Sequence, residues 1–382
     1  MNRLWHILTG EYPPQRGGVS DYVGLLAAGL GEAGLDVHVW APRWSDPTAV
    51  VANVTVHRCA GRWTAGDLRR LSHEMDSLDG AGPLLVQYTP NAWGRRGLNL
   101  GFCRWLESRR DAGSEVRLLV HEPFYPWRLL DRPQRWVLAG VQRAMIRIAL
   151  KAASRVYLST QSWEPLLRPH RAGPYQQMTW LPMPSTIPVF ASPTKVQGIQ
   201  KTLLPDRGLV LGSFGTFSPL IRRMLSRVLP SLLVSLDDRA CLLMGRNSDQ
   251  FAAQLLERHP RLSGRVHARD GLDAQELSAH LQACDVLVQP YPDGASSRRT
   301  SLMAALAHGV PTVTTLGFLS DSIWTECGCA ILVPASDPRE MIQATEQLLA
   351  HPEARARLSG HAQKVYGEHF ALEKTIQELL RG

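Results

Sequence analysis

The segment after residue 284 carries the residue types best suited to bind a phosphorylated ligand. Residues 286–289 are apolar and predict a strand, and residues 302–308 predict a helix. Between them stand Asp293 and a run of hydroxyl and guanidinium side chains, namely Ser297, Arg298, Arg299, Thr300 and Ser301. A helix N-terminus offers N–H groups and a favourable dipole, and arginine binds phosphate oxygens in pairs. We therefore predict a diphosphate site here, in preference to a capped helix with solvent-facing arginines.

A second candidate loop lies between a predicted strand at residues 4–8 and a predicted helix at residues 23–33. Residues 11–22 read E-Y-P-P-Q-R-G-G-V-S-D-Y. Gly17 and Gly18 permit the close approach of a phosphate or a sugar, and the following helix N-terminus favours an anion. A tight turn without a ligand is the alternative, and for a bare glycine pair it is the better interpretation.

The elements that position these two loops can be read from the pattern of apolar residues. Short apolar runs alternate with longer amphipathic segments along the chain. This alternation predicts βαβ units and parallel sheets. We predict one series of strands at residues 4–8, 37–40, 84–87, 116–120 and 155–158. A second series is predicted at residues 209–212, 241–244, 265–267, 286–289, 312–314 and 330–333. Because the pattern restarts, we expect an α/β protein of two Rossmann-like, doubly wound domains.

The length of 382 residues also favours two domains. Residues 181–188 contain three prolines, which block both helix and central strand, so this segment is the best linker candidate. We expect an N-terminal domain at residues 1–190 and a C-terminal domain at residues 191–366. Residues 367–382 should form a helix that packs back on the N-terminal domain. Ligands of open α/β sheets bind at the carboxyl ends of the strands, so we expect a site in a cleft between the domains.

Composition and charge narrow the classes of partner. The formal net charge of +8 favours acidic partners such as phosphates or anionic lipid headgroups. No apolar stretch is long enough to span a bilayer or to serve as a signal peptide, so we expect a cytoplasmic protein. No nucleic-acid-binding pattern accompanies the charge. The cysteines lack CxxC spacing and predict small core residues in a reducing compartment, with no metal site; they are Cys59, Cys103, Cys241, Cys284, Cys327 and Cys329.

The segment from Glu11 to Val39 resembles the N-terminal signature of family 4 glycosyltransferases, which have the GT-B fold. The matching letters are E-Y-P-P at residues 11–14, G-G-V at residues 17–19, Tyr22, and G-L-D-V-H-V at residues 34–39. The resemblance extends over nearly the full chain, from about residue 4 to about residue 370. It implies a retaining, metal-independent glycosyltransferase that needs no cofactor beyond a nucleotide-diphosphate sugar as its donor.

The resemblance also implies roles for single residues. His121 follows a predicted strand at the position where family members place a histidine beside the transferring sugar, and Gly17 and Gly18 are expected under the donor diphosphate. Gly271 and Leu272 match the backbone that brackets the nucleotide base. The residues expected on the acceptor side are Glu11, Tyr22, Gln87, Tyr88 and Glu122, although aromatic packing explains the pair after residue 86 equally well.

The sequence departs from the family at the positions of two glutamates, an arginine and a lysine. Of the usual two glutamates seven residues apart, the second falls at Ala304 and the first near Ser296; with a small insertion, Asp293 is the candidate for the first. Thr216 stands where the family has an arginine that neutralises the diphosphate, and Arg222 is a candidate for the lysine that follows it. We infer that Arg298 and Arg299 take over the compensation of diphosphate charge.

The function that we predict is sugar transfer to a hydroxyl acceptor in glycan, polysaccharide or glycolipid biosynthesis. The acceptor class stays open between a glycan, a lipid-linked molecule and a small molecule. The alternative is a non-catalytic GT-B relative that binds a nucleotide sugar or a glycan, which the missing glutamate and arginine favour. A basic amphipathic helix at residues 134–155 allows peripheral contact with the inner face of a membrane, but we prefer an ordinary helix that covers the first sheet.

Overall fold

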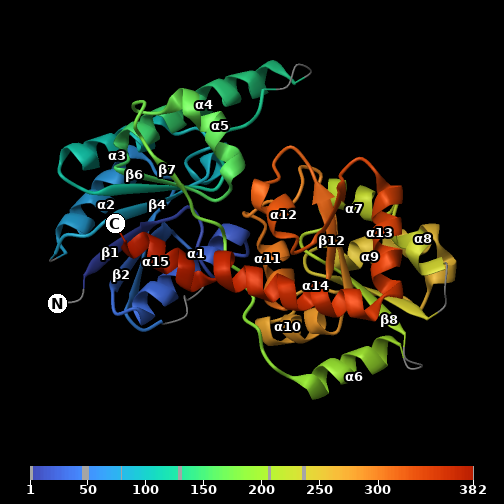
Figure 1. Ribbon diagram of the computed structural model, residues 1–382. Helices are drawn as coiled ribbons and strands as arrows, with labels where there is room; N and C mark the ends of the chain where they lie inside the picture. Colours follow the sequence, from blue (N-terminus) through green and yellow to red (C-terminus); the bar gives the residue numbers. More distant parts are fainter. Residues whose placement is uncertain are drawn as a thin grey trace. The chain divides into compact units, whose positions relative to one another are not determined.

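The computed structural model describes residues 3–44, 51–78, 80–127, 131–204, 208–234 and 238–381, and these residues form two compact units (Figure 1). Unit 1 is Met1–Pro182 with Thr375–Gly382, and unit 2 is Met183–Lys374. The boundary between the two units lies after Pro182, where the partners of the backbone hydrogen bonds change. The N–H of Leu181 donates to Leu158 O at 2.8 Å, whereas the N–H of Met183 donates to Ser297 O at 2.9 Å.

Unit 1 is built on a seven-stranded parallel sheet in the order β3-β2-β1-β4-β5-β6-β7. The strands are β1 (Leu4–Leu8), β2 (Asp36–Pro42), β3 (Val54–Ala60), β4 (Leu84–Tyr88), β5 (Val116–Val120), β6 (Arg155–Leu158) and β7 (Met178–Trp180). Its helices are α1 (Gly18–Glu32), α2 (Ala65–Asp76), α3 (Leu100–Asp111), α4 (Pro133–Ala152) and α5 (Glu164–Leu167). Strands β1, β4 and β5 are buried along their whole length, which explains why each carries only one polar or charged residue, namely His6, Gln87 and Arg117.

Unit 2 repeats this plan with a six-stranded parallel sheet in the order β10-β9-β8-β11-β12-β13. The strands are β8 (Leu209–Phe214), β9 (Arg239–Met244), β10 (Val266–Arg269), β11 (Val286–Gln289), β12 (Thr312–Leu316) and β13 (Ile331–Pro334). The helices are α6 (Pro193–Leu203), α7 (Pro219–Leu225), α8 (Leu229–Val234), α9 (Ser248–Arg258), α10 (Ala274–Gln282), α11 (Thr300–Ala307), α12 (Ser322–Cys327), α13 (Pro338–Ala350) and α14 (Pro352–Val365). Two apolar clusters include side chains of this sheet, one with α8, α9 and α13 and the other with α10 and α11.

The last helix, α15 (Leu372–Leu380), begins at the end of unit 2 and its remaining residues belong to unit 1. The buried guanidinium of Arg117 on β5 donates to Leu379 O at 2.6 Å and lies over the Trp5 ring of β1. This contact fixes the end of the chain to the first sheet.

The prediction of two parallel α/β domains is confirmed. Strands β3 and β7 and helix α6 were missed. Both strands lie at sheet edges, and β7 has only three residues, so neither carries a long apolar run. Two helices begin earlier than predicted: α1 at Gly18 and α11 at Thr300, so the polar loop residues before them form their first turns.

Candidate functional site

In unit 2, the loop that follows β11 brings one carboxylate and two guanidinium groups together. Arg298 Nη2 donates to Asp293 Oδ2 at 2.6 Å, and Arg299 Nη2 pairs with the other carboxylate oxygen. The three side chains are 17% to 26% exposed, so their charges are only partly screened by water. The cluster carries one net positive charge, which favours the binding of an anion.

The loop is held from several sides. The N–H of Ala295 donates to Thr315 O at 2.7 Å, and the N–H of Ser297 donates to the carboxylate of Asp321 at 2.7 Å. Gly294 has a φ of +93°, and a Cβ there would lie 2.3 Å from Ser320 Oγ. Only glycine fits at this point, and the chain can then turn back to place both arginines beside Asp293.

Gln289 and Tyr291 join this loop to the end of β8. The amide oxygen of Gln289 accepts from Phe214 N–H at 3.0 Å, and its amide nitrogen lies 3.1 Å from Tyr291 Oη. Tyr291 Oη lies 2.8 Å from Ser301 Oγ on α11, and the Arg299 guanidinium lies 4.8 Å from the Tyr291 ring centre. Burial raises the pKa of Tyr291, so its hydroxyl stays neutral. Sequence reasoning missed both residues, although a glutamine that ends an apolar strand is a usable signal.

Helix α11 begins directly after this cluster. Its N-cap residue, Arg299, makes no side-chain capping hydrogen bond, so no capping side chain covers the N–H groups of Thr300 and Ser301. Ala304, the position of the missing glutamate, is fully buried on α11. The helix therefore presents backbone dipole and hydroxyl groups at its start, and its buried face is apolar.

At the end of β8 the structure places Thr216 on the surface, where its carbonyl accepts from Asn247 Nδ2 at 3.0 Å. Arg222, predicted near the diphosphate, instead lies on α7 and donates to Gln250 Oε1 at 2.9 Å and to Gln254 Oε1 at 3.4 Å. Both glutamines belong to α9. The Arg222 side chain thus points towards α9, and its role near the diphosphate stays a prediction.

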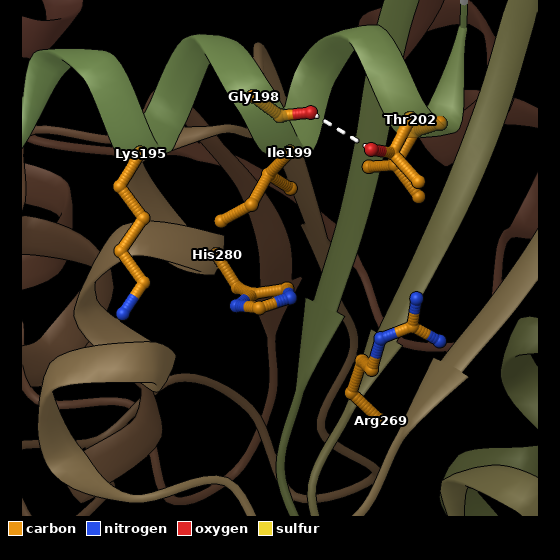
Figure 2. Close-up of a pocket in the computed structure, with 7 residues that line it drawn as sticks. Lys195, Gly198, Ile199, Thr202, Arg269 and His280 are labelled. Atoms are coloured by element: carbon orange, nitrogen blue, oxygen red, sulfur yellow. Dashed lines mark hydrogen bonds between the residues drawn. The ribbon is translucent and has the colours of Figure 1, made fainter.

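Gly271 and Leu272 lie between β10 and α10. Gly271 is exposed with a φ of +71°, and the Leu272 side chain packs against the apolar cluster of α10 and α11. A cavity of about 420 Å³ lies nearby, and Figure 2 shows that its lining residues come from α6 itself and from Arg269 at the end of β10 and His280 on α10. They are Lys195, Gly198, Ile199, Thr202, Leu203, Arg269 and His280. This lining includes none of the residues predicted to bind the donor.

In unit 1, the glycine loop already holds a carboxylate at the start of α1. Glu11 Oε1 accepts from Ser20 N–H at 3.1 Å, and a Cβ on Gly17 would lie 2.8 Å from both Glu11 carboxylate oxygens. A Cβ on Gly18 would have no neighbouring atom within 4 Å. The anion position at this helix N-terminus is thus occupied by Glu11, while Gly18 is open to the close approach of a ligand.

His121 follows β5 and is 7% exposed. Its Nε2 lies 2.8 Å from Gln87 Oε1, which orients the ring, and its carbonyl accepts from Trp163 Nε1 at 3.0 Å. The Tyr22 ring meets the imidazole edge to face, with 5.6 Å between ring centres. Glu122, the next residue, is exposed.

Three of the predicted acceptor-side residues are buried in unit 1. Tyr22, Gln87 and Tyr88 each have no exposed surface; Tyr22 lies on α1, and Gln87 and Tyr88 are the last two residues of β4. The Tyr22 and Gln87 side chains contact His121. The place of these three residues on the acceptor side stays a prediction. Gly18 and Glu122 are exposed, Glu11 is partly exposed, and His121 is buried.

Residues 209–351 match the protein family described as Glycosyl transferases group 1. Sucrose-phosphate synthase from Thermosynechococcus elongatus is 15% identical over 100% of this chain and 98% of its own, with a TM-score of 0.77. The chain has the GT-B fold and contains a glycosyltransferase domain. No curated protein sequence matches it.

Two further structures resemble this glycosyltransferase along their whole length. WaaG, a glycosyltransferase involved in lipopolysaccharide biosynthesis, is 13% identical over 99% of this chain and 100% of its own, with a TM-score of 0.68. HepE from Anabaena, in complex with UDP and glucose, is 14% identical over 100% of this chain and 99% of its own, with a TM-score of 0.67. The arginine loop of the glycosyltransferase, residues 293–299, lies inside the region that matches the family.

Among the described residues of the glycosyltransferase, no group of three or more His, Cys, Asp or Glu side chains is arranged to hold a metal ion. None of the helices formed by the described residues is both long and apolar enough to cross a membrane.

Proposed function

We propose that this enzyme moves a sugar from a nucleotide-diphosphate sugar to a hydroxyl acceptor with retention of the anomeric configuration, and that the donor is a UDP-sugar. The observation that carries the proposal is the pairing of Asp293 with Arg298 and Arg299 at the start of α11. HepE, whose structure was solved with UDP and glucose and with UDP-glucose, supports the choice of UDP. A nucleotide sugar of a glycan or glycolipid pathway fits this chemistry.

The arginines supply the charge compensation that the reaction needs. When the glycosidic bond to the diphosphate breaks, negative charge grows on the departing phosphate. Arg298, Arg299 and the N–H groups of Thr300 and Ser301 stabilise this charge, because they lie in a partly water-excluded site where electrostatic stabilisation is strong. A phosphate oxygen of the leaving group takes the proton of the acceptor hydroxyl, so no separate general base is required.

Asp293 has two functions in this proposal. It holds the arginines together before the donor binds, and it takes the place of the first glutamate of the family near the donor sugar. The second glutamate has no counterpart at Ala304, which is buried. We propose that the ribose is bound by other groups at the carboxyl ends of β8 to β10, where Thr216, Asn247 and Gly271 are exposed.

In unit 1, His121 is proposed to contact the transferring sugar. Gln87 orients the imidazole through the 2.8 Å contact and is a positioning residue. Gly18, Glu11 and Glu122 are proposed to lie along the acceptor, since a carboxylate accepts hydrogen bonds from sugar hydroxyls.

A calorimetric screen of the purified enzyme with UDP, GDP, ADP and TDP and their sugars, with and without magnesium, tests the proposal. We expect selective binding of UDP and its sugars without magnesium, followed by slow donor hydrolysis. Binding without any hydrolysis or transfer would support the non-catalytic alternative. The absence of binding to every nucleotide would overturn the proposal for both the donor site and the reaction.

We further propose that unit 1 contacts an anionic membrane surface through the start of α4. Trp127, Trp136 and Val137 are 55%, 43% and 62% exposed, which is unusual for large apolar side chains. The two tryptophan rings stack at 6.4 Å, and the Arg143 guanidinium lies 3.9 Å from the Trp127 ring centre. Aromatic rings beside arginines suit the headgroup region of a bilayer.

Sedimentation with vesicles tests this contact. We expect binding to vesicles that contain phosphatidylglycerol and not to pure phosphatidylcholine vesicles, and a loss of binding in Trp127→Ala with Trp136→Ala. Tyr175→Ala is the matched control, because Tyr175 is an exposed aromatic residue of the same unit outside this patch. Equal sedimentation of the double variant and the wild type would refute the membrane contact.

A further inference from the structure

Two cysteine sulfurs meet at the end of α12. The helix ends at Cys327, Gly328 follows with a φ of +60°, and Cys329 is next. This reversal of the chain brings Cys327 Sγ to 3.0 Å from Cys329 Sγ. The cysteines were expected to be small core residues, but Cys327 is partly exposed and contacts Cys329.

The two sulfurs differ in access and in acidity. Cys327 is partly exposed and Cys329 is buried. The hydrogen bond between the sulfurs is the main cause that lowers the pKa of Cys327 to about 6, and nearby His361 contributes in the same direction against the opposing effect of burial. The same hydrogen bond raises the pKa of Cys329. Cys327 is therefore the thiolate that a reagent meets first, and Cys329 is held as a thiol behind it.

The remaining cysteines lack these properties. Cys103, Cys241 and Cys284 are buried, and burial raises the pKa of each thiol. Cys59 is partly exposed like Cys327, but burial and the nearby Glu74 raise its pKa to about 11. Cys59 thus matches Cys327 in access and differs from it in acidity and in having no neighbouring thiol within hydrogen-bond distance among the described residues.

We propose that Cys327 and Cys329 form an oxidisable dithiol, which a small disulfide such as glutathione disulfide converts to an intramolecular disulfide. The Cys327 thiolate attacks one sulfur of the small disulfide and releases one thiolate. The Cys329 sulfur then attacks Cys327 Sγ, loses its proton and releases the second small thiol. Two protein thiols are oxidised, one small disulfide is reduced to two thiols, and the protein loses two hydrogen atoms.

The local geometry permits the second step. A disulfide bond is about 2.05 Å long, so the sulfurs must approach each other by about 1 Å from their separation of 3.0 Å. Gly328 lies between them, and the space around its Cβ position contains no heavy atom within 4 Å. The connecting residue therefore has free space on the side of its Cβ position.

The first experiment is mass spectrometry after a substoichiometric amount of iodoacetamide at pH 7. We expect Cys327 to be alkylated at least tenfold faster than Cys59. A lower rate at Cys327, or equal rates at the two sites, would contradict the assignment of Cys327 as the attacking sulfur.

The second experiment treats the full-length enzyme with glutathione disulfide and identifies the products by peptide mapping. The wild type should lose two hydrogens and show a Cys327–Cys329 linkage. Cys329→Ser should stop at a glutathione adduct on Cys327, and in Cys327→Ser the remaining Cys329 should not react. A stable glutathione adduct on wild-type Cys327, or the absence of any reaction, would overturn the proposal.

Discussion

The carboxylate of Asp293 binds the guanidinium of Arg298 at 2.6 Å, and its second oxygen pairs with Arg299. The two cations predicted to receive a diphosphate are therefore held by an internal anion. An incoming diphosphate brings more negative charge than one carboxylate, so it can bind the arginines in addition to Asp293 or displace it. Substitutions of Asp293, Arg298 and Arg299 should therefore have different effects on diphosphate binding.

Loss of either arginine should weaken UDP binding. Hydrogen bonds to charged groups contribute about 1.5–3 kcal/mol each, so we expect Arg298→Ala and Arg299→Ala to lower UDP affinity at least tenfold in calorimetry. Arg223→Ala is the control, because Arg223 is an exposed arginine of the same unit. Unchanged affinity in both loop variants would remove these residues from the donor site.

Asp293→Asn should separate binding from turnover. The variant keeps the shape of the side chain and removes the charge that competes with the diphosphate. We expect UDP to bind more tightly by on the order of 1 kcal/mol, while the rate of sugar transfer falls. Titration calorimetry and a donor-hydrolysis assay measure the two effects. A weaker affinity for UDP would mean that Asp293 chiefly orders the arginines.

His121→Ala should lower turnover by about a hundredfold and leave UDP affinity unchanged, because His121 belongs to unit 1 and is proposed to contact the sugar. The exposed His73→Ala is the matched control on the same unit. Thermal unfolding must accompany the assay, since the change also removes the partner of Gln87. A collapse of the melting temperature with loss of all binding would show that His121 is structural.

Gly294→Ala should destabilise the arginine loop. The added Cβ would lie 2.3 Å from Ser320 Oγ and 2.4 Å from Gly317 N, at a φ of +93°. We expect a loss of about 1–3 kcal/mol in the free energy of unfolding together with weaker UDP binding. Gly264→Ala shares a positive φ but has no neighbouring atom within 4 Å, so the difference between the two variants isolates the close contact. Equal losses in both would show that the loop accommodates the methyl group.

The free energy of unfolding should fall as the pH falls from 6.5 to about 4. Burial is the main cause that lowers the pKa of His6 and of His57 from 6.5 to about 4, with nearby His38 adding to it. Between these values the unfolded chain binds more protons than the folded one, so acid favours unfolding, on the order of 1 kcal/mol per pH unit.

Urea unfolding between pH 5 and pH 8 measures this dependence. His57→Gln should reduce the slope, and His369→Gln, which changes an exposed histidine, should leave it unchanged. A stability that does not change with pH in this window would argue against neutral, buried histidines.

Local order in the sequence determined the fold class and the place of the arginine loop. Strand, loop and helix follow one another within residues 286–307, so apolar spacing and helix-start chemistry were enough to predict that Arg298 and Arg299 precede a helix. The repeated βαβ pattern likewise predicted two parallel sheets. The two edge strands of the first sheet, β3 and β7, escaped prediction because neither carries a long apolar run.

Only the tertiary structure decided which side chains meet and which are buried. Glu11 fills the start of α1, Arg222 turns to α9, and Tyr22 packs under His121, each through contacts between separate segments. The distance between the Cys327 and Cys329 sulfurs could not be predicted from the sequence either, because it depends on how α12 ends. Secondary structure follows from neighbours along the chain, whereas burial, ion pairing and acidity follow from neighbours in space.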